Sequence, residues 1–249
     1  MQAPPTRGQS RPDFDIAFEP DPGGTLLAGI SSYGLAGLTA VSYLVDAYEL
    51  TERGHLSTSG LPSMTPFENG VPRHHTRFFG GDLPMTVLVG ELFIPAGVAD
   101  AFADALFSWL EAHDVDEIAL LAGVPVAHGP EEHRAYHVAT ADYRARRLEG
   151  VDVPGMGRGF LDGMRASLVE RGLDSPVAVG VFVTPVHPQA PDVDAAIRLL
   201  DAVESVYGVE VDVDPLREYA EEVRRYYAEL AERVAAVEES QRPEDRMYM

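Results

Sequence analysis

The sequence predicts an α/β protein with a three-layer α/β/α arrangement, and two observations predict it. Short apolar runs alternate along the chain with segments whose apolar residues recur at helical spacing. The runs Met85–Ile94 and Val177–Val183 are apolar almost throughout, which is typical of strands buried on both faces of a parallel or mixed sheet. Such strands need helices on both faces of the sheet, which gives three layers.

Residues 25–48 form the unit around which the prediction is organised. Thr25–Ile30 has the length and apolar composition of a buried strand, and a polar turn follows it. Ser31 or Ser32 could cap the next element, a helix that begins near Leu35. The first turns of that helix carry small residues, so we expect the helix to lie close to the sheet; these residues are Gly34, Ala36, Gly37 and Ala40.

The remaining elements follow in order. Helices are expected at Val98–His113, where Phe102, Leu106, Trp109 and Leu110 share one face, then through Leu161–Val169, and after the capping residues Pro191-Asp192. The further strands are expected at Phe14–Glu19, Tyr48–Ser57, Val71–Phe79 as an edge strand, Met85–Ile94, Asp116–Gly123, Ala135–Thr140, Arg144–Leu148 and Val177–Val183.

The chain divides into four parts. Residues 1–13 are expected to be disordered and have no signal-peptide pattern, and residues 14–213 form the α/β domain. Asp214-Pro215 begins an amphipathic helix over 214–237, whose apolar stripe packs either on its own domain or in a seam between subunits. Residues 238–249 are polar apart from their tip, and we expect a flexible tail.

Composition limits the function. Acidic residues number 40 and basic residues 19, all of them Arg, for a formal net charge of -21. An acidic, lysine-free surface suits a halophilic archaeal protein that stays dispersed in molar salt, and a GC-rich genome is the alternative source of the Arg bias. This charge argues against nucleic acid and anionic membranes as partners. With no Cys and no apolar run of about 20 residues, we expect a cytoplasmic protein.

Several short motifs resemble the proteasome assembly chaperone family in its archaeal and bacterial branch. The resemblance covers roughly residues 14–222. It implies a mixed sheet like that of nucleoside phosphorylases, used as a chaperone scaffold and not as an enzyme. The motifs are Gly34-Leu35-Ala36-Gly37 followed by Tyr43-Leu44, Gly90-Glu91, Gly123-Val124-Pro125, Gly157-Arg158-Gly159-Phe160-Leu161, and Asp194-Ala195-Ala196 followed by Leu199-Leu200.

The sequence ends in Met247-Tyr248-Met249, an apolar residue, a tyrosine and a terminal residue. This pattern resembles the tail by which proteasome activators and some assembly chaperones dock on the α-ring of the core particle. A terminal carboxylate can pair with a basic side chain in a pocket, while the Tyr248 ring and the Met247 thioether supply apolar area. We therefore predict that Met247, Tyr248 and Met249 bind α-ring subunits.

The sequence contains no complete catalytic or metal-binding pattern. The turn Gly29–Gly34 is neither a phosphate-binding P-loop nor a dinucleotide fingerprint, although a helix N-terminus beside Ser31 and Ser32 could hold an anion. Glu91 could line a cleft, but we expect it to cap a helix or to pair with an Arg. Adjacent His74 and His75 should face opposite sides of a strand. The best candidate metal ligands are expected to diverge, so no metal or cofactor is predicted; they are His128, His133, His137, Glu131 and Glu132.

The sequence thus favours a non-enzymatic, homo-oligomeric proteasome assembly chaperone or core-particle binder, with no catalytic residues. Two alternatives stay open. One is a nucleoside-phosphorylase-like or hydrolytic enzyme that uses a cleft above Gly29–Gly34. The other is an oligomeric scaffold unrelated to the proteasome.

Overall fold

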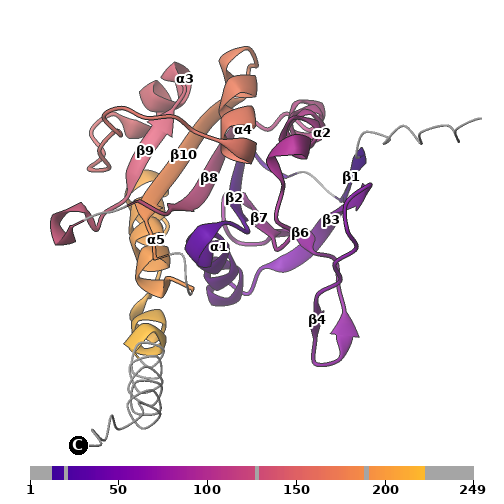
Figure 1. The fold of residues 1–249 in the computed structure, drawn as a ribbon, viewed down its shortest axis with the longest axis horizontal. Coiled ribbons are helices and arrows are strands. Elements are labelled where there is room, and N and C mark those ends of the chain that lie inside the picture. Colours follow the sequence, from indigo (N-terminus) through magenta and orange to yellow (C-terminus); the bar gives the residue numbers. More distant parts are fainter. Residues whose placement is uncertain (1–12, 20–21, 127–128, 188–190, 222–249) are drawn as a thin grey trace, which may run out of the picture. The chain divides into compact units, whose positions relative to one another are not determined.

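The structure, a computed structural model, describes residues 13–19, 22–126, 129–187 and 191–221. Among these residues, eight strands form one sheet in the order β1-β3-β6-β7-β2-β8-β10-β9. Figure 1 shows this sheet running through the molecule with helices packed against it. The sheet strands are β1 (Asp13–Phe18), β2 (Thr25–Ile30), β3 (Thr51–Ser59), β6 (Thr76–Gly80), β7 (Thr86–Gly90), β8 (Glu117–Val124), β9 (Tyr136–Ala139) and β10 (Ala178–Pro185).

The sheet is parallel at its centre and antiparallel at both ends. Strand β2 pairs in parallel with β7 and β8, and β8 pairs in parallel with β10. Strand β9 on one side, and β6, β3 and β1 on the other, add antiparallel pairs. All residues of β2, β7 and β10 are buried, which confirms the prediction that continuous apolar runs mark strands covered on both faces.

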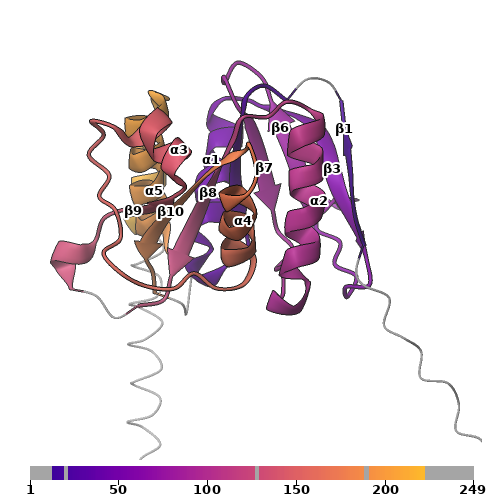
Figure 2. The ribbon, with the colours of Figure 1, turned by 90° about the horizontal axis from the view of Figure 1, so that it is seen from above.

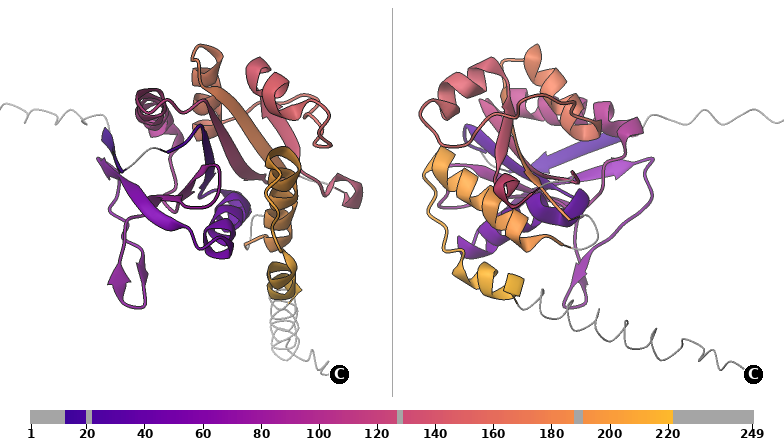
Figure 3. Two further views of the ribbon diagram at one scale, coloured as in Figure 1. Left: turned by 180° about the vertical axis from the view of Figure 1, so that it is seen from behind. Right: turned by 60° about the vertical axis from the view of Figure 1, so that its left-hand side comes forward.

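Helices cover both faces, so the predicted three-layer α/β/α fold is confirmed. Figure 2 shows α2 (Ala99–Ala112) and α4 (Gly163–Leu173) on one face and α1 (Ala36–Ala47) and α5 (Val193–Tyr207) on the other. The left view of Figure 3 shows α1 and α5 on the same side of the sheet. The predicted apolar face of α2 is buried in the core that this helix forms with the sheet; it comprises Phe102, Leu106, Trp109 and Leu110.

Helix α1 lies close to the sheet, as its small residues predict. A Cβ atom at Gly29 of β2 would be 2.2 Å from the carbonyl oxygen of Gly37, inside the contact distance of any real side chain. Ala36 and Ala40 are fully buried beside it. The missing side chains at Gly29 and Gly37 therefore set the spacing between the first helix and the central strands.

The predicted edge strand Val71–Phe79 is wrong in two respects. It is divided into β5 (Val71–Pro72), which pairs with β4 (Phe67–Glu68) as a hairpin, and β6, which lies between β3 and β7 in the sheet. Figures 1 and 3 show this hairpin extending away from the sheet. Strand order depends on pairings between distant segments, so the polar residues Arg73–His75 just before β6 do not mark it as an edge strand.

The predicted strand at Arg144–Leu148 is also wrong, because this segment forms a π-helical turn after the short helix α3 (Ala141–Tyr143). Long-range contacts favour the helical turn. Tyr143 is fully buried with its ring against Gly180 of β10, and the turn brings Arg147 to Glu117 at the start of β8. Tertiary contacts here override the local alternation of polar and apolar residues.

Residues 212–221 belong to a second unit that runs from Asp212 onward. Residues 214–221 of it are helical; the backbone N–H of Arg217 donates to the carbonyl of Val213, and its guanidinium pairs with Asp214 at 2.8 Å. The rest of the predicted helix over 214–237 lies outside the described residues. No helix among the described residues has the length and apolar character that a membrane span requires.

Candidate functional site

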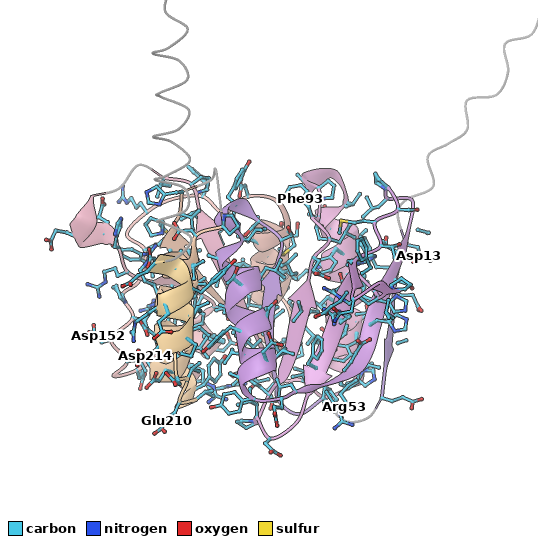
Figure 4. All side chains as sticks on the ribbon, turned by 90° about the horizontal axis from the view of Figure 1, so that it is seen from below. Asp13, Arg53, Phe93, Asp152, Glu210 and Asp214 are labelled. Carbon is cyan, nitrogen blue, oxygen red and sulfur yellow. The ribbon has the colours of Figure 1, made fainter. Side chains whose placement is uncertain are left out.

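The first candidate site is the edge of the sheet at which the parallel strands end. Strand β2 lies between β7 and β8, and the chain leaves β2 toward α1 on one face but leaves β7 toward α2 on the other. In open α/β sheets, such a reversal of direction leaves a crevice outside the carboxyl ends of the strands, where ligands bind. Figure 4 shows Phe93, just after β7, at this edge and Arg53 at the opposite edge.

The turn after β2 contains unfavourable local geometry. Gly34 has φ +66° and lies against Val186, while Leu35 has φ 50°, a left-handed conformation that residues with side chains rarely adopt. The backbone N–H of Asp192 donates to the carbonyl of Gly34 at 2.8 Å, which ties the turn to the start of α5. Surrounding contacts therefore hold this turn in a conformation that it would not adopt alone.

The prediction that Ser31 or Ser32 caps the first helix is wrong. A 3-10 turn, η1 (Tyr33–Leu35), separates both serines from α1, whose N-cap residue is Leu35 without a side-chain hydrogen bond. The Ser32 Oγ atom is buried and has no hydrogen-bond partner among the described residues. Sequence reasoning identified the correct turn but assigned its serines the wrong role.

A cavity of ≈ 200 Å³ opens beside this turn. Most of its wall is apolar. Arg165 also lines the cavity, but its guanidinium group already donates to the Gly123 carbonyl at 3.3 Å and to the Asp162 carboxylate at 2.5 Å. The cavity therefore suits an apolar group better than a phosphate or a sugar. It is lined by Ile30, Ser31, Ser32, Tyr33, Phe93, Ile94, Ala96, Leu120, Leu121, Ala122, Asp162, Gly163, Met164 and Arg165.

Glu91 follows β7 at the same edge and does not line the cavity. It pairs with the guanidinium groups of Arg73 and, at 3.9 Å, of Arg77, so the prediction that it meets an Arg is confirmed. The hydrogen bond to Glu91 raises the pKa of Arg73, whereas burial lowers that of Arg77. This carboxylate is engaged in holding the start of β6 against the end of β7.

Asp192 caps α5, as its sequence context predicts. One carboxylate oxygen accepts the backbone N–H of Ala195 at 2.9 Å, and the other accepts the backbone N–H of His187 at 3.0 Å and contacts the His187 ring nitrogen at 3.1 Å. Burial raises the pKa of Asp192, but these hydrogen bonds outweigh it and leave the pKa below its ordinary value. The carboxylate therefore stabilises the helix start.

The candidate metal ligands do not converge in the described part of the chain. His137 Nδ1 lies 2.9 Å from the Val153 carbonyl, and Glu132 accepts the backbone N–H of Gly129. His128 is outside the described residues, and the ring of His133 lies 6.5 Å from that of His187. Within the described ranges, no group of three His, Asp or Glu side chains could hold a metal ion.

His74 and His75 lie between β5 and β6 and not in a strand, so the predicted strand alternation does not apply to them, although their rings have different neighbours. The ring of His74 stacks on that of His55 with centroids 3.5 Å apart, while His75 Nδ1 lies 2.9 Å from Thr76 Oγ1. Burial lowers the pKa of both His55 and His75. Both residues still line one surface pocket, beside Arg73 and the loop Leu61–Thr65.

A buried polar cluster at the opposite edge was missed by the sequence analysis. Glu117 is fully buried at the start of β8 and accepts hydrogen bonds from Thr25 at 3.0 Å and from Arg147 at 2.8 and 3.1 Å. Nearby, the hydroxyl groups of Tyr143 and Tyr207 are 2.6 Å apart, and burial raises the pKa of both. No spacing rule links these five residues, because they come from four separate segments.

The predicted partner-binding residues Met247, Tyr248 and Met249 lie outside the described residues. The structure therefore leaves their role a prediction.

Comparisons with known proteins agree with this fold. The family model of the PAC2 family matches residues 26–231. A crystal structure of Pyrococcus furiosus PbaA, described as an archaeal homolog of proteasome-assembly chaperone, superposes with a TM-score of 0.81 at 18% identity, over 92% of this chain and 95% of that chain. No curated protein matches the sequence.

Two further structures are similar. Pyrococcus furiosus PbaB, described as an archaeal proteasome activator, has a TM-score of 0.75 at 20% identity, over 88% of this chain and 99% of that chain. A PAC2 family protein from Streptomyces avermitilis has a TM-score of 0.60 at 18% identity, over 84% of this chain and 96% of that chain. These likenesses show the fold, and the family model covers most of the chain. The resemblance found in the motifs is thereby confirmed, and the chain belongs to the PAC2 family.

Proposed function

We propose that this protein is a non-enzymatic proteasome assembly chaperone or core-particle-binding protein that acts as a homo-oligomer in the cytoplasm. The observation that carries the proposal is the family match over residues 26–231. Two proteins of the same fold support it, since one is described as a homolog of proteasome-assembly chaperone and the other as a proteasome activator.

The described residues at the carboxyl edge of the sheet support a scaffold role. Three charged side chains near this edge are engaged by neighbours in the same chain. Glu91 is held by Arg73, Asp192 caps α5, and Arg165 is held by Asp162 and the Gly123 carbonyl. This arrangement stabilises loops, and it does not favour the alternative of a phosphorylase or hydrolase.

We further propose that residues Met247–Met249 dock into pockets of the α-ring. The terminal carboxylate would pair with a basic side chain, while Tyr248 and Met247 fill the adjoining apolar space. Each tail would bind weakly alone. In an oligomer, the first bound tail raises the effective concentration of the next, so several tails together bind far more tightly than one.

The test measures binding of the full chain to core particles from the same organism, at its native salt concentration, by co-sedimentation. Deletion of Met247–Met249 and extension of the chain by four residues after Met249 should each abolish binding. Tyr248→Ala should weaken it, whereas the control Tyr219→Ala, at an exposed tyrosine of the helix, should not. Unchanged binding after deletion would refute the tail mechanism, and no binding by the intact chain would refute the proposed function.

A further inference from the structure

We propose that the cavity at the carboxyl ends of β2 and β7 is a docking socket for one tyrosine side chain on a basic segment of a partner protein. The socket consists of the turn Ser31–Tyr33, the loop Phe93–Ala96 and the start of α4 at Asp162–Arg165, over a floor of β8 residues. This inference goes beyond the proposed function, because it concerns the α/β body and not residues 247–249.

The volume of the cavity selects the size of the occupant. Sites for whole drug-sized ligands typically enclose about 300–1,000 Å³. The space here is ≈ 200 Å³, below that range, and the buried residues Ile30 of β2 and Leu120 of β8 are among those that line it. A single aromatic side chain fits such a space better than a nucleoside or a cofactor.

The mouth of the cavity indicates a protein partner. Tyr33 and Phe93 both line the cavity and are still 56% and 60% exposed. Exposed aromatic residues around a small apolar hole are typical of interface centres, where one side chain fills a pocket and its neighbours exclude water. A small molecule inside the cavity would leave both rings in water, whereas a protein segment laid across the mouth would cover them.

A hydroxyl on the occupant would satisfy a group that the fold leaves unsatisfied. Ser32 lines the cavity, and its buried Oγ has no partner among the described residues. An unsatisfied buried hydroxyl is unfavourable. The Oγ atom is closed to solvent as the side chain stands, so Ser32 would have to rotate about its Cα–Cβ bond toward the cavity, where a tyrosine hydroxyl would provide the missing hydrogen bond.

Charge at the mouth selects a basic segment. Asp162 lines the cavity and its side chain is 85% exposed, whereas the side chain of its partner Arg165 is only 14% exposed. The charge presented to an approaching segment is therefore negative, on a chain with a formal net charge of -21. Arginine or lysine residues beside the anchoring tyrosine would complement this field.

The experiment uses the full chain and the capped tripeptide acetyl-Arg-Tyr-Arg-amide, with binding followed by NMR chemical-shift changes at moderate salt. We expect it to bind about tenfold or more tightly than Arg-Ala-Arg, because the tyrosine ring is buried. We expect a preference of about fivefold over Arg-Phe-Arg, from one hydrogen bond. Glu-Tyr-Glu should bind more weakly than Arg-Tyr-Arg.

Four variants locate the binding. Ala96→Leu fills the cavity from an exposed position and should abolish binding, whereas Ala112→Leu, at an exposed position outside the cavity, should preserve it. Ser32→Ala should remove the preference for tyrosine over phenylalanine, and Asp162→Asn should reduce the preference for Arg-Tyr-Arg over Glu-Tyr-Glu. If Ala96→Leu lowers the melting temperature strongly, the truncation Phe93→Ala at the exposed mouth replaces it.

Three results would overturn the proposal. The first is equal binding of Arg-Tyr-Arg and Arg-Ala-Arg, and the second is unchanged binding by both Ala96→Leu and Phe93→Ala. The third is a different occupant. A synthetic peptide of residues 241–249 that bound in place of Arg-Tyr-Arg would identify the chain's own tail, and loss of oligomers in Ala96→Leu would identify a second copy. A failed core-particle assay leaves these expectations unchanged, so the two proposals can fail separately.

Discussion

Gly37 of α1 lies directly against the carbonyl group of Leu121 in β8, so that a Cβ atom at Gly37 would be 1.9 Å from that oxygen. Real Cβ atoms do not approach a carbonyl oxygen this closely. The absence of a side chain at this position is therefore what allows the first helix to pack on the centre of the sheet, next to the turn that forms the cavity.

Gly37→Ala is accordingly expected to destabilise the protein. Alanine would favour the helix by about 1 kcal/mol on intrinsic propensity. Overpacking against backbone atoms costs about 3 kcal/mol and outweighs that gain. Denaturant unfolding should show the loss, whereas the control Gly97→Ala, where a Cβ would meet nothing within 4 Å, should change stability little. Equal stability of the two variants would contradict the packing argument.

The pair Arg147–Glu117 provides a second test. Glu117 is fully buried, so after Arg147→Ala its carboxylate keeps, among the described residues, the hydrogen bond from Thr25 and a longer ion pair with Arg146 at 3.6 Å. Breaking a buried ion pair typically costs about 3–5 kcal/mol, and we expect the lower end because the Arg147 side chain is 34% exposed.

The control for this variant is Arg171→Ala. Arg171 pairs with Asp104, but both side chains are more than a third exposed, so the loss should stay within about 1 kcal/mol. Denaturant unfolding of both variants measures the difference. A loss at Arg147 no larger than that at Arg171 would show that Glu117 is not stabilised by its buried partner.

The centre of the fold could be predicted from sequence because its signals are local. A continuous apolar run such as Val177–Val183 reports burial on both faces, and a run of small residues such as Gly34–Gly37 reports close packing. Strand order and the π-helical turn at Arg144–Leu148 could not be predicted in this way. They depend on pairings such as Arg147 with Glu117, which are 30 positions apart in the sequence.

The turn beside the cavity was located from sequence as the site of the alternative enzyme, whereas the predicted binding residues Met247–Met249 lie outside the described residues. The change from strand to helix after Ile30 located the turn, because a strand–turn–helix unit is readable from periodicity. The cavity also needs Phe93 and Met164, which arrive from segments with no local sign of a shared site. The unpartnered hydroxyl of Ser32 follows from η1, a short turn that periodicity does not reveal.

Asp192 predicts a defined dependence of stability on pH. Its pKa in the folded protein lies below its ordinary value of about 3.9. The stabilisation by its carboxylate is therefore fully present above about pH 4 and is lost as the pH falls through the lower, folded pKa. Asp192→Asn should cost about 1 kcal/mol at pH 7, and the difference from the wild type should shrink in acid.

Denaturant unfolding between pH 7 and pH 2.5 measures this difference. Glu170→Gln, at an exposed position of α4, serves as the control and should differ little from the wild type throughout. A cost for Asp192→Asn that stayed constant down to pH 2.5 would mean that the charge of this carboxylate does not stabilise the start of α5.

The stacked rings of His55 and His74 lead to the last prediction. Burial first, and then the neighbouring His74, lower the pKa of His55, although Glu52 and Asp15 oppose the shift. The neutral stack therefore contributes stability above the ordinary histidine pKa of about 6.5, and this contribution is lost as the pH falls through the lower, folded pKa.

We expect hydrogen exchange of residues 60–75, corrected for its intrinsic pH dependence, to accelerate from pH 7 to pH 5. His74→Phe keeps a stacking ring but removes the neighbour that helps to lower the pKa of His55, so it should reduce this acceleration, whereas His113→Gln, on α2, should not. Equal acceleration in wild type and His74→Phe would show that repulsion between the two rings does not govern the opening of this segment.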